Sequence, residues 1–219
     1  MVVRVAEQAV KSGASEVVIA TDFEKIMQAA SEHNIKAVMT RIDHASGTDR
    51  IAEVAQKLNW ADDEIVVNVQ GDEPLIDPQL INEVALTLAH SRDAVMATAC
   101  HAIHDEASLL NPNIVKVVMG ANGNALYFSR APIPYPRDEV YKYNIQAHRH
   151  IGIYAYRVGF LKQYTQLSVT ELEKIESLEQ LRVLHHGYKI GVTVTKNAPA
   201  SGVDTKEDLD YVRSVFKDE

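Results

Sequence analysis

Short apolar segments rich in β-branched residues alternate with amphipathic segments along the chain, and this alternation constrains the fold more than any other feature. The amphipathic segments have the spacing of helices, with apolar residues three and four positions apart. Four strands are predicted in the first half, over residues 16–22, 36–40, 64–70 and 94–100. Three helices are predicted between them, over residues 23–34, 49–58 and 78–90. This order predicts an α/β domain with a largely parallel sheet that has helices on both faces.

The second half predicts an antiparallel insertion in that sheet. Residues 114–119 and 124–129 flank a turn that begins at Gly120, which is the pattern of a hairpin. Residues 148–157 alternate strictly and predict a strand. A long helix over residues 171–186, a strand over 189–196 and a helix over 206–216 complete the prediction. At 219 residues, we expect a single domain over residues 1–219.

Composition excludes several classes of protein. The net charge of −8 disfavours a nucleic-acid partner, because phosphate neutralisation needs clustered Lys and Arg. Cys100 is the only cysteine, so no intrachain disulfide forms and a reducing compartment is expected. The apolar runs are too short to span a membrane, and the N-terminus lacks the pattern of a signal peptide. The expected location is therefore the cytoplasm, with no membrane partner.

The start of the chain is unusual for this class of fold. Residues 1–12 predict a helix that ends at Gly13, with no N-cap residue and no strand before it. In doubly wound folds the first strand is usually central, and the loop after it holds phosphates. Either that unit is missing here, or the fold begins with a helix, and the pattern favours neither alternative.

Two acidic loops are candidates for a metal site. The first loop stands at the carboxyl end of a predicted buried strand, which is the edge where open α/β sheets bind ligands. It consists of Gln70, Gly71, Asp72 and Glu73. Carboxylate oxygens at this edge suit a Mg²⁺ ion that also binds the phosphates of a substrate. The alternative is a plain turn at the end of the strand, because Gly-Asp is common in turns. The segment 202–205 offers Asp204 as a second carboxylate on the same metal.

That second loop has a purely structural alternative. Thr205 and Asp208 have the spacing of a capping box, so either Asp204 or Thr205 could cap the last helix. The segment Ser46–Arg50 raises the same question, because its hydroxyl and N–H groups suit a nucleotide, whereas Thr48 or Asp49 could simply be an N-cap.

The predicted sheet offers further polar candidates. Arg130 ends the strand over 124–129, and its guanidinium suits a carboxylate or phosphate, although a solvated charge is the commoner case. Successive side chains of the predicted strand over 148–157 point to opposite faces of the sheet. One face suits a ligand with many hydroxyl groups, and the other is expected to pack in the core. His148 and His150 on the polar face could begin a zinc site, but no acidic or Cys ligand stands at a convincing spacing from them. The polar face consists of His148, His150, Gly152, Tyr154 and Tyr156, and the apolar face of Ile151, Ile153 and Ala155.

The predicted helix over 171–186 carries an apolar stripe that fits either core or a subunit contact. The stripe consists of Leu172, Ile175, Leu178 and Leu181. Glu179 and Gln180 flank it and would be surface residues on pattern alone. The chain has no G-x-S-x-G, C-x-x-C, phosphate-loop or H-E-x-x-H motif, so covalent catalysis has no candidate nucleophile.

Taken together, eight segments in the same order and spacing resemble the 3-deoxy-manno-octulosonate (KDO) cytidylyltransferases, or CMP-KDO synthetases, across nearly the whole chain. The segments are VVIATD, MTRIDHASGTDRIAEV, VVNVQGDEPLI, NPNIVKVV, ALYFSRAPIPY, RHIGIYAYR, LEKIESLEQLRVL and GVDTKEDLD. The resemblance implies a Rossmann-like α/β nucleotidyltransferase fold, a homodimer, and transfer of CMP from CTP to KDO for lipopolysaccharide synthesis. A cytidylyltransferase for another acidic sugar, such as 8-amino-KDO or sialic acid, and a non-catalytic paralogue remain alternatives.

The resemblance also implies roles for individual residues. Asp72 and Asp204 match the metal-binding aspartates, which hold Mg²⁺, and with Arg130 they form the expected catalytic set. The sugar-acid pocket matches Gln70, Arg130, His150, Tyr154, Glu179 and Gln180. The cytidine side matches Ser46, Gly47, Thr48 and Arg50.

The chain departs from the family pattern at its start. The family opens with a strand and a basic phosphate-binding loop, and about 28 residues corresponding to them are absent before Met1. We therefore expect residues 1–219 alone to be nearly silent in catalysis. A central first strand would also leave two neighbouring strands without hydrogen-bonding partners.

Overall fold

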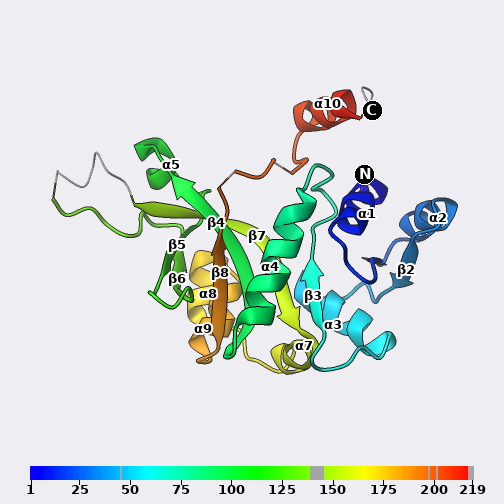
Figure 1. Cartoon of the computed structure of the whole chain (residues 1–219), viewed down its shortest axis with the longest axis horizontal. Helices are drawn as coiled ribbons and strands as arrows, with labels where there is room; N and C mark the ends of the chain where they lie inside the picture. Colours follow the sequence, from blue (N-terminus) through cyan, green and yellow to red (C-terminus); the bar gives the residue numbers. More distant parts are fainter. Residues whose placement is uncertain (45, 139–145, 197, 201, 217–219) are drawn as a thin grey trace.

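The computed structural model describes residues 1–44, 46–138, 146–196, 198–200 and 202–216 (Figure 1). Its strands form two separate sheets. The smaller sheet pairs β1 (Val18–Thr21) with β2 (Lys36–Met39) in parallel. The larger sheet has the order β6-β5-β7-β4-β8, with β3 paired to β7. Its strands are β3 (Ile65–Asn68), β4 (Ala94–Ile103), β5 (Lys116–Met119), β6 (Ala125–Ser129), β7 (Ala147–Arg157) and β8 (Lys189–Val194).

Within the described ranges the predicted elements are found, with one helix divided and two short helices added. The predicted helices are α1 (Val2–Lys11), α2 (Glu24–Glu32), α3 (Gly47–Lys57), α4 (Pro78–His90) and α10 (Lys206–Val215). The additions are α5 (Glu106–Leu110) and α7 (Val158–Tyr164). None of the helices in the described ranges has the length and apolarity that crossing a membrane requires.

The sheet is mixed, as predicted, but less parallel than the alternation of elements implied. Strand β7 lies between β3 and β4 and runs antiparallel to both. The hairpin of β5 and β6 is antiparallel too, and β5 also pairs with β7 in that sense. Parallel pairing among the described strands is limited to β1 with β2 and β4 with β8. A local alternation pattern does not reveal which strand enters the sheet between which neighbours.

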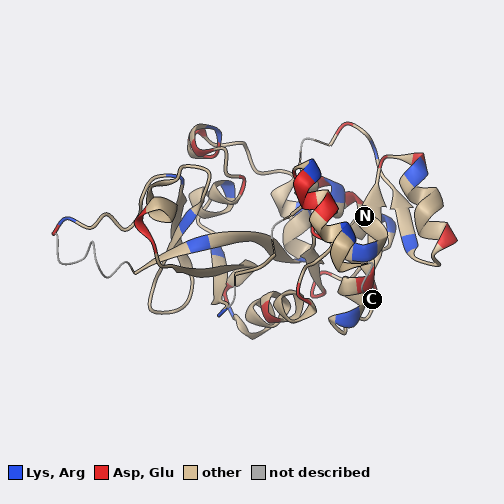
Figure 2. Ribbon diagram, turned by 90° about the horizontal axis from the view of Figure 1, so that it is seen from above, with Lys and Arg blue, Asp and Glu red and all other residues tan. Residues whose placement is uncertain are grey.

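Helices cover both faces of the larger sheet. Helix α4 packs on one face, where Leu80, Val84 and Leu88 form a core cluster with Ile151 and Ile153 of β7. The other face packs against α7 and α9 (Gln180–His185), and its cluster includes the side chain of Tyr156. Acidic and basic residues are interspersed along the helices of the described chain (Figure 2).

The predicted helix over residues 171–186 is two helices, α8 (Glu171–Glu176) and α9 (Gln180–His185). Ser177 interrupts it with φ of 52°, in the left-handed region that a helix cannot continue through. A buried ion pair, with Arg182 Nε 2.8 Å from Glu173 Oε2, folds α9 back against α8.

This break corrects the predicted apolar stripe. Leu178 and Leu181 are core residues, whereas Leu172 and Ile175 are exposed. The stripe is not continuous, because the left-handed turn at Ser177 rotates α9 relative to α8. The same turn carries Glu179 and Gln180 to the inner side of the molecule.

Candidate active site

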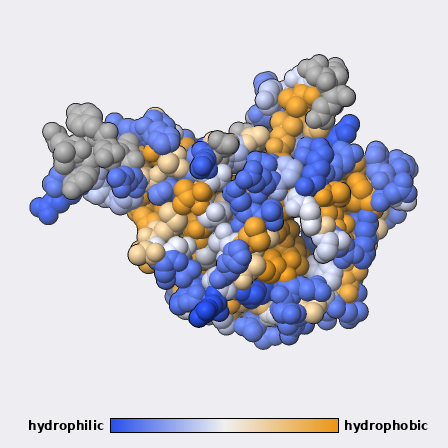
Figure 3. All heavy atoms as spheres, in the orientation of Figure 1, coloured by the Kyte–Doolittle hydropathy of each residue, from blue (hydrophilic) through white to orange (hydrophobic). Residues whose placement is uncertain are grey.

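A cavity of about 1030 Å³ lies between the two sheets and is lined along the length of β1 and β3, as far as Asp72 beyond the carboxyl end of β3. Residues of α1, α3, β7 and the α8–α9 turn complete its lining. The space-filling view shows apolar surface in the middle of the molecule, over α4 and β3 (Figure 3). In addition to Asp72, seven predicted site residues line the cavity: Gly47, Thr48, Arg50, Gln70, Tyr154, Glu179 and Gln180.

The two predicted acidic loops meet at this cavity. Val203 N donates a 2.8 Å hydrogen bond to the carbonyl oxygen of Asp72. Gly202 lies against Asp72 as well: a Cβ atom placed on Gly202 would be in ordinary van der Waals contact, 3.4 Å from that oxygen and 3.8 Å from Asp72 Oδ2. The structure therefore brings the Asp72 loop and the Asp204 loop together, as the metal-site hypothesis requires.

The capping alternative holds for Thr205 and leaves Asp204 free for other roles. Thr205 is the N-cap of α10 and forms a capping box with Asp208, which accepts from the Thr205 N–H at 2.8 Å. The side chain of Asp204 is exposed and takes no part in the cap. Capping and metal binding are thus compatible, since they use different side chains.

The donor set at the two loops suits Mg²⁺ better than zinc. Among the described residues no group of three or more His, Cys, Asp and Glu could hold a metal by itself. Mg²⁺ is commonly bound by one or two carboxylates together with substrate phosphates, which is what Asp72 and Asp204 offer. Burial, and then the charge of Asp72, raises the pKa of Glu73 to about 7, so Glu73 adds less than a full negative charge at neutral pH.

The segment Ser46–Arg50 forms the first turn of α3. Ser46 is the N-cap, and its hydroxyl accepts from the Asp49 N–H at 3.2 Å. The cap predicted at Thr48 or Asp49 is therefore two or three residues too late. Thr48 instead points inward, where its hydroxyl lies 3.2 Å from Tyr156 Oη.

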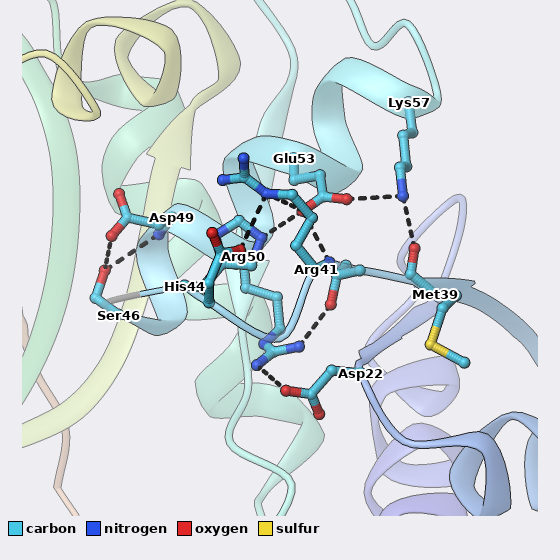
Figure 4. A network of polar contacts seen from close by, with 11 residues as sticks. Asp22, Met39, Arg41, His44, Ser46, Asp49, Arg50, Glu53 and Lys57 are labelled. Atoms are coloured by element: carbon cyan, nitrogen blue, oxygen red, sulfur yellow. Dashed lines mark hydrogen bonds and ion pairs between the residues drawn. The ribbon is translucent and has the colours of Figure 1, made fainter.

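Arg50 joins the carboxyl ends of β1 and β2 (Figure 4). Its guanidinium donates to Thr40 Oγ1 at 2.5 Å and to Asp22 Oδ2 at 2.8 Å. Beside it, Glu53 contacts His44, Lys57 and the main chain of Arg41. The Arg50 side chain thus has protein partners, and its predicted role on the cytidine side stays a prediction.

The inner wall of the cavity is aromatic and polar. The His150 ring lies 5.4 Å from Tyr154, and Tyr154 lies 6.2 Å from Tyr156, which confirms that these residues share one face of β7. Gln180 is buried, and its Nε2 has no hydrogen-bond partner among the residues that the structure describes. Burial raises the pKa of Glu179 beside it. An unpaired buried donor that lines a cavity is suited to a ligand oxygen.

His150 and Arg130 are not part of the cavity lining. His150 Nε2 lies 2.9 Å from Thr98 Oγ1, and burial lowers the pKa of the imidazole to about 3, so it is neutral. Arg130 Nε donates to Glu176 O at 2.7 Å, and its Nη1 donates to Pro112 O at 3.1 Å. Arg130 therefore stabilises the end of α8 in this structure, and its predicted contact with a substrate carboxylate stays a prediction.

Sequence analysis missed Tyr164 as a residue of the cavity. Its ring is buried, it lines the cavity, and its hydroxyl has no hydrogen-bond partner within the described protein. Tyr164 lies on α7, which was not predicted because this helix is only seven residues long. The available signal was the apolar spacing of Phe160, Leu161 and Tyr164, which fits one turn of helix.

Comparison with known proteins gives relatives along the whole chain. Residues 1–190 match the cytidylyltransferase family. The 3-deoxy-manno-octulosonate cytidylyltransferase of Neisseria gonorrhoeae (strain NCCP11945) is 59% identical over 223 residues, covering 99% of this chain and 88% of the relative. The enzyme of the same description from Neisseria meningitidis serogroup A is 57% identical with the same coverage.

Two solved structures are similar as well. CMP:2-keto-3-deoxy-manno-octonic acid synthetase complexed with CTP aligns with a TM-score of 0.90 and 41% identity, over 99% of this chain and 87% of the other. A putative glucose-1-phosphate thymidylyltransferase from Bacillus anthracis, in complex with a sucrose, aligns with a TM-score of 0.62 and 12% identity, over 100% and 82%. The second likeness concerns the fold alone.

Proposed function

Since the chain belongs to the cytidylyltransferase family, we propose that it joins CMP from CTP to 3-deoxy-manno-octulosonate (KDO) and releases pyrophosphate. The product is the activated sugar used in lipopolysaccharide synthesis. The observation that carries the proposal is the contact between the Asp72 and Asp204 loops at the rim of a cavity whose wall is formed by Tyr154 and Gln180. Phosphate chemistry and sugar binding can therefore take place side by side.

The reaction is a direct in-line displacement. The anomeric hydroxyl of KDO attacks the α-phosphorus of CTP, the new bond is a phosphodiester, and pyrophosphate leaves. Such chemistry needs positioning and charge neutralisation, and it needs no covalent nucleophile. Mg²⁺, held by Asp72 and Asp204, would supply charge neutralisation at the phosphates.

The residues of the cavity divide the remaining tasks. The buried Nε2 of Gln180 and the hydroxyls of Tyr154 and Tyr164 would bind sugar hydroxyls, since all three residues line the cavity. The first turn of α3 offers main-chain N–H groups to the nucleotide, next to Thr48. The proposal includes a homodimer in the cytoplasm, supported by the resemblance to the family, by the single Cys100 and by the exposed side chain of Ile175.

The test combines turnover with binding. Pyrophosphate release is followed with KDO, Mg²⁺ and each of CTP, UTP, GTP and ATP, and then with CTP and a panel that includes 8-amino-KDO and sialic acid. Calorimetry of KDO binding reads the sugar pocket independently of turnover. We expect KDO to bind measurably, and we expect whatever turnover residues 1–219 support to be fastest with CTP and KDO. Preference for another acidic sugar, or absence of both KDO binding and KDO-dependent release, would contradict the proposal.

A further inference from the structure

Strand β7 contains a bulge where it passes β4. Thr98 of β4 is opposite Tyr154 of β7. The next residue along β4, Ala99, is opposite Ile151, so two residues of β7 have no opposite residue on β4. An even number of inserted residues preserves the alternation of side chains along the strand. His150 and Tyr154 therefore lie on one face, on either side of the bulge, with 5.4 Å between their ring centroids.

The bulge lies opposite a gap between two strands on the other edge of β7. Strand β3 pairs with β7 as far as Tyr154, and β5 pairs with it at Arg149 and beyond. Gln70, which follows β3, reaches this gap, and its Nε2 lies 3.4 Å from the carbonyl oxygen of Gly152. A Cβ atom on Gly152 would lie 3.3 Å from the same nitrogen, so a side chain here would push against the Gln70 amide. The bulge therefore contacts a residue of the cavity lining directly.

The hydroxyl of Thr98 holds the bulge from the side of β4. Thr98 is fully buried. Its Oγ1 lies 2.7 Å from the carbonyl oxygen of Ile153 and 3.0 Å from that of Ile151. The same oxygen lies 2.9 Å from His150 Nε2. One hydroxyl thus joins two main-chain carbonyls and an imidazole of the bulged strand.

The number of available hydrogens assigns the tautomer of His150. A carbonyl oxygen can only accept, and a threonine hydroxyl has one hydrogen to donate. If that hydrogen pointed to the imidazole, two carbonyl oxygens would lie within 3.0 Å of Thr98 Oγ1 with no hydrogen between them, which is repulsive. The hydroxyl therefore donates to the carbonyls of Ile151 and Ile153, and His150 Nε2 carries a hydrogen that it donates to Thr98.

This hydrogen bond also decides the character of the second ring nitrogen. Burial lowers the pKa of His150 to about 3, so the imidazole is neutral and carries a single N–H at neutral pH. With that hydrogen on Nε2, the Nδ1 atom has a lone pair and can only accept. Within the described part of the chain, the hydrogen bond of this ring is the one through Nε2. Tyr154, beside the ring, lines the cavity.

We propose that Thr98 is a positioning residue for the sugar site, whose hydroxyl holds the bulge of β7 and fixes His150 as the Nε2–H tautomer with Nδ1 as an acceptor. The part that concerns the sugar rests on the proposed function, in which His150 contacts KDO. An accepting Nδ1 binds a hydroxyl group of KDO and repels its carboxylate. His150 therefore selects the hydroxylated part of the sugar acid, and the carboxylate is bound elsewhere.

The first measurement reads the tautomer in the unaltered chain. Two-bond proton–nitrogen correlation spectra at pH 7 distinguish the protonated from the bare nitrogen in each of the nine histidines, and His150→Gln identifies the signals of His150. We expect the neutral Nε2–H form. In the KDO complex the Nδ1 resonance should move upfield, as it does when a lone pair accepts a hydrogen bond. The Nδ1–H tautomer, a charged ring, or an unmoved Nδ1 resonance in the complex would overturn the proposal.

The second measurement removes the hydroxyl while keeping the shape of the side chain. In Thr98→Val the His150 ring loses its acceptor, so the two tautomers should exchange and KDO binding, measured by calorimetry, should weaken about tenfold. Thr98→Ser keeps the hydroxyl and should retain both properties. Thr87→Val removes a hydroxyl that donates to the carbonyl of Glu83 in α4, and it should change neither. Full KDO affinity in Thr98→Val, or equal losses in Thr98→Val and Thr98→Ser, would contradict the positioning role.

KDO binding and the tautomer are independent readouts. A parent chain that binds no KDO but shows the Nε2–H tautomer contradicts the proposed function and supports the hold of Thr98 on the ring. A parent chain that binds KDO and shows the other tautomer contradicts the role of Thr98 alone. Because the tautomer is measured in the parent, the result stands even where Thr98→Val does not fold.

Discussion

Val203 N donates a hydrogen bond of 2.8 Å to the main-chain oxygen of Asp72, and this bond joins two loops that lie far apart in the sequence. The bond uses main-chain atoms, so it leaves the carboxylates of Asp72 and Asp204 available to a ligand. It is also insensitive to substitution of either side chain. The two carboxylates can therefore be altered without separating the loops.

The first prediction concerns metal binding at these loops. Asp72→Asn and Asp204→Asn should each weaken binding of Mn²⁺, as a probe for Mg²⁺, by tenfold or more in the presence of CTP, because each removes one anionic ligand. Electron paramagnetic resonance of free Mn²⁺ gives the affinity. Circular dichroism should be unchanged. The exposed Asp63→Asn is the matched control, and full affinity in both loop variants would refute the shared site.

The second prediction separates ligand binding from stability at Gln180. The Nε2 donor is buried without a partner, which disfavours the free protein by about 1–3 kcal/mol. Gln180→Met should therefore leave the free energy of unfolding equal or higher, and it should weaken KDO binding by about tenfold. Urea denaturation and calorimetry measure the two quantities. Gln166→Met, on the surface, should change neither, and a stability loss in Gln180→Met would show that the amide is structural.

The third prediction concerns the left-handed residue between α8 and α9. Ser177→Val should lower the free energy of unfolding by about 1–2 kcal/mol, because a β-branched residue is strained at φ of 52°. Affinity for KDO should fall as well, since the turn carries Glu179 and Gln180. Ser177→Gly accepts this backbone conformation and should keep both properties. Thermal and urea unfolding of the pair provide the comparison, and equal stability of the two would exclude strain at this position.

The fourth prediction concerns the buried ion pair of Glu173 and Arg182, whose side chains are 9% and 10% exposed. Arg182→Met leaves a buried carboxylate without its partner and should lower the free energy of unfolding by about 3–5 kcal/mol. The double variant with Glu173→Gln should recover much of that loss. A double-mutant cycle by urea denaturation measures the coupling, and simple additivity of the two losses would contradict the prediction.

The fifth prediction concerns the pH dependence at Glu53. The hydrogen bond from Lys57, followed by those from the Arg41 N–H and His44, lowers the pKa of this carboxyl from 4.5 to about 2. A lowered folded-state pKa contributes stability that is present above pH 4.5 and is lost as the pH falls from 4.5 toward 2. Glu53→Gln should therefore be less stable than the parent at pH 7, and the difference should shrink below pH 4.5. Glu64→Gln, which is exposed, should show no such slope.

The periodicity of the chain predicts most helices and strands, because apolar spacing reflects local burial. It could not predict that β7 enters between β3 and β4, because pairing depends on contacts between segments distant in sequence. The break at Ser177 was missed for a similar reason. Serine lacks the usual preference of Gly or Asn for the left-handed region, and the contact of Arg182 with Glu173 favours the turn.

The candidate site was predicted in the same uneven way. The position of Asp72 after an apolar strand places it at the ligand-binding edge, and this follows from strand direction alone. The surroundings of Arg130 could not be foreseen, because its partners Pro112 and Glu176 belong to other elements. Tyr164 escaped prediction because short helices carry too few residues to establish a period.

The division of the strands into two sheets has a consequence for the cooperativity of unfolding. The segment from α1 to β2 has a small core of its own, around Ala6, Ile19 and Ala30. Its links to the remainder include the packing of α1 on α4, the contacts of α3 with β1, the side chain of Arg50 and the hydrogen bond from Lys57 to the main chain of Met39. Such a segment can open while the larger sheet stays intact, so we expect residues 2–39 to unfold as a separate sub-global unit.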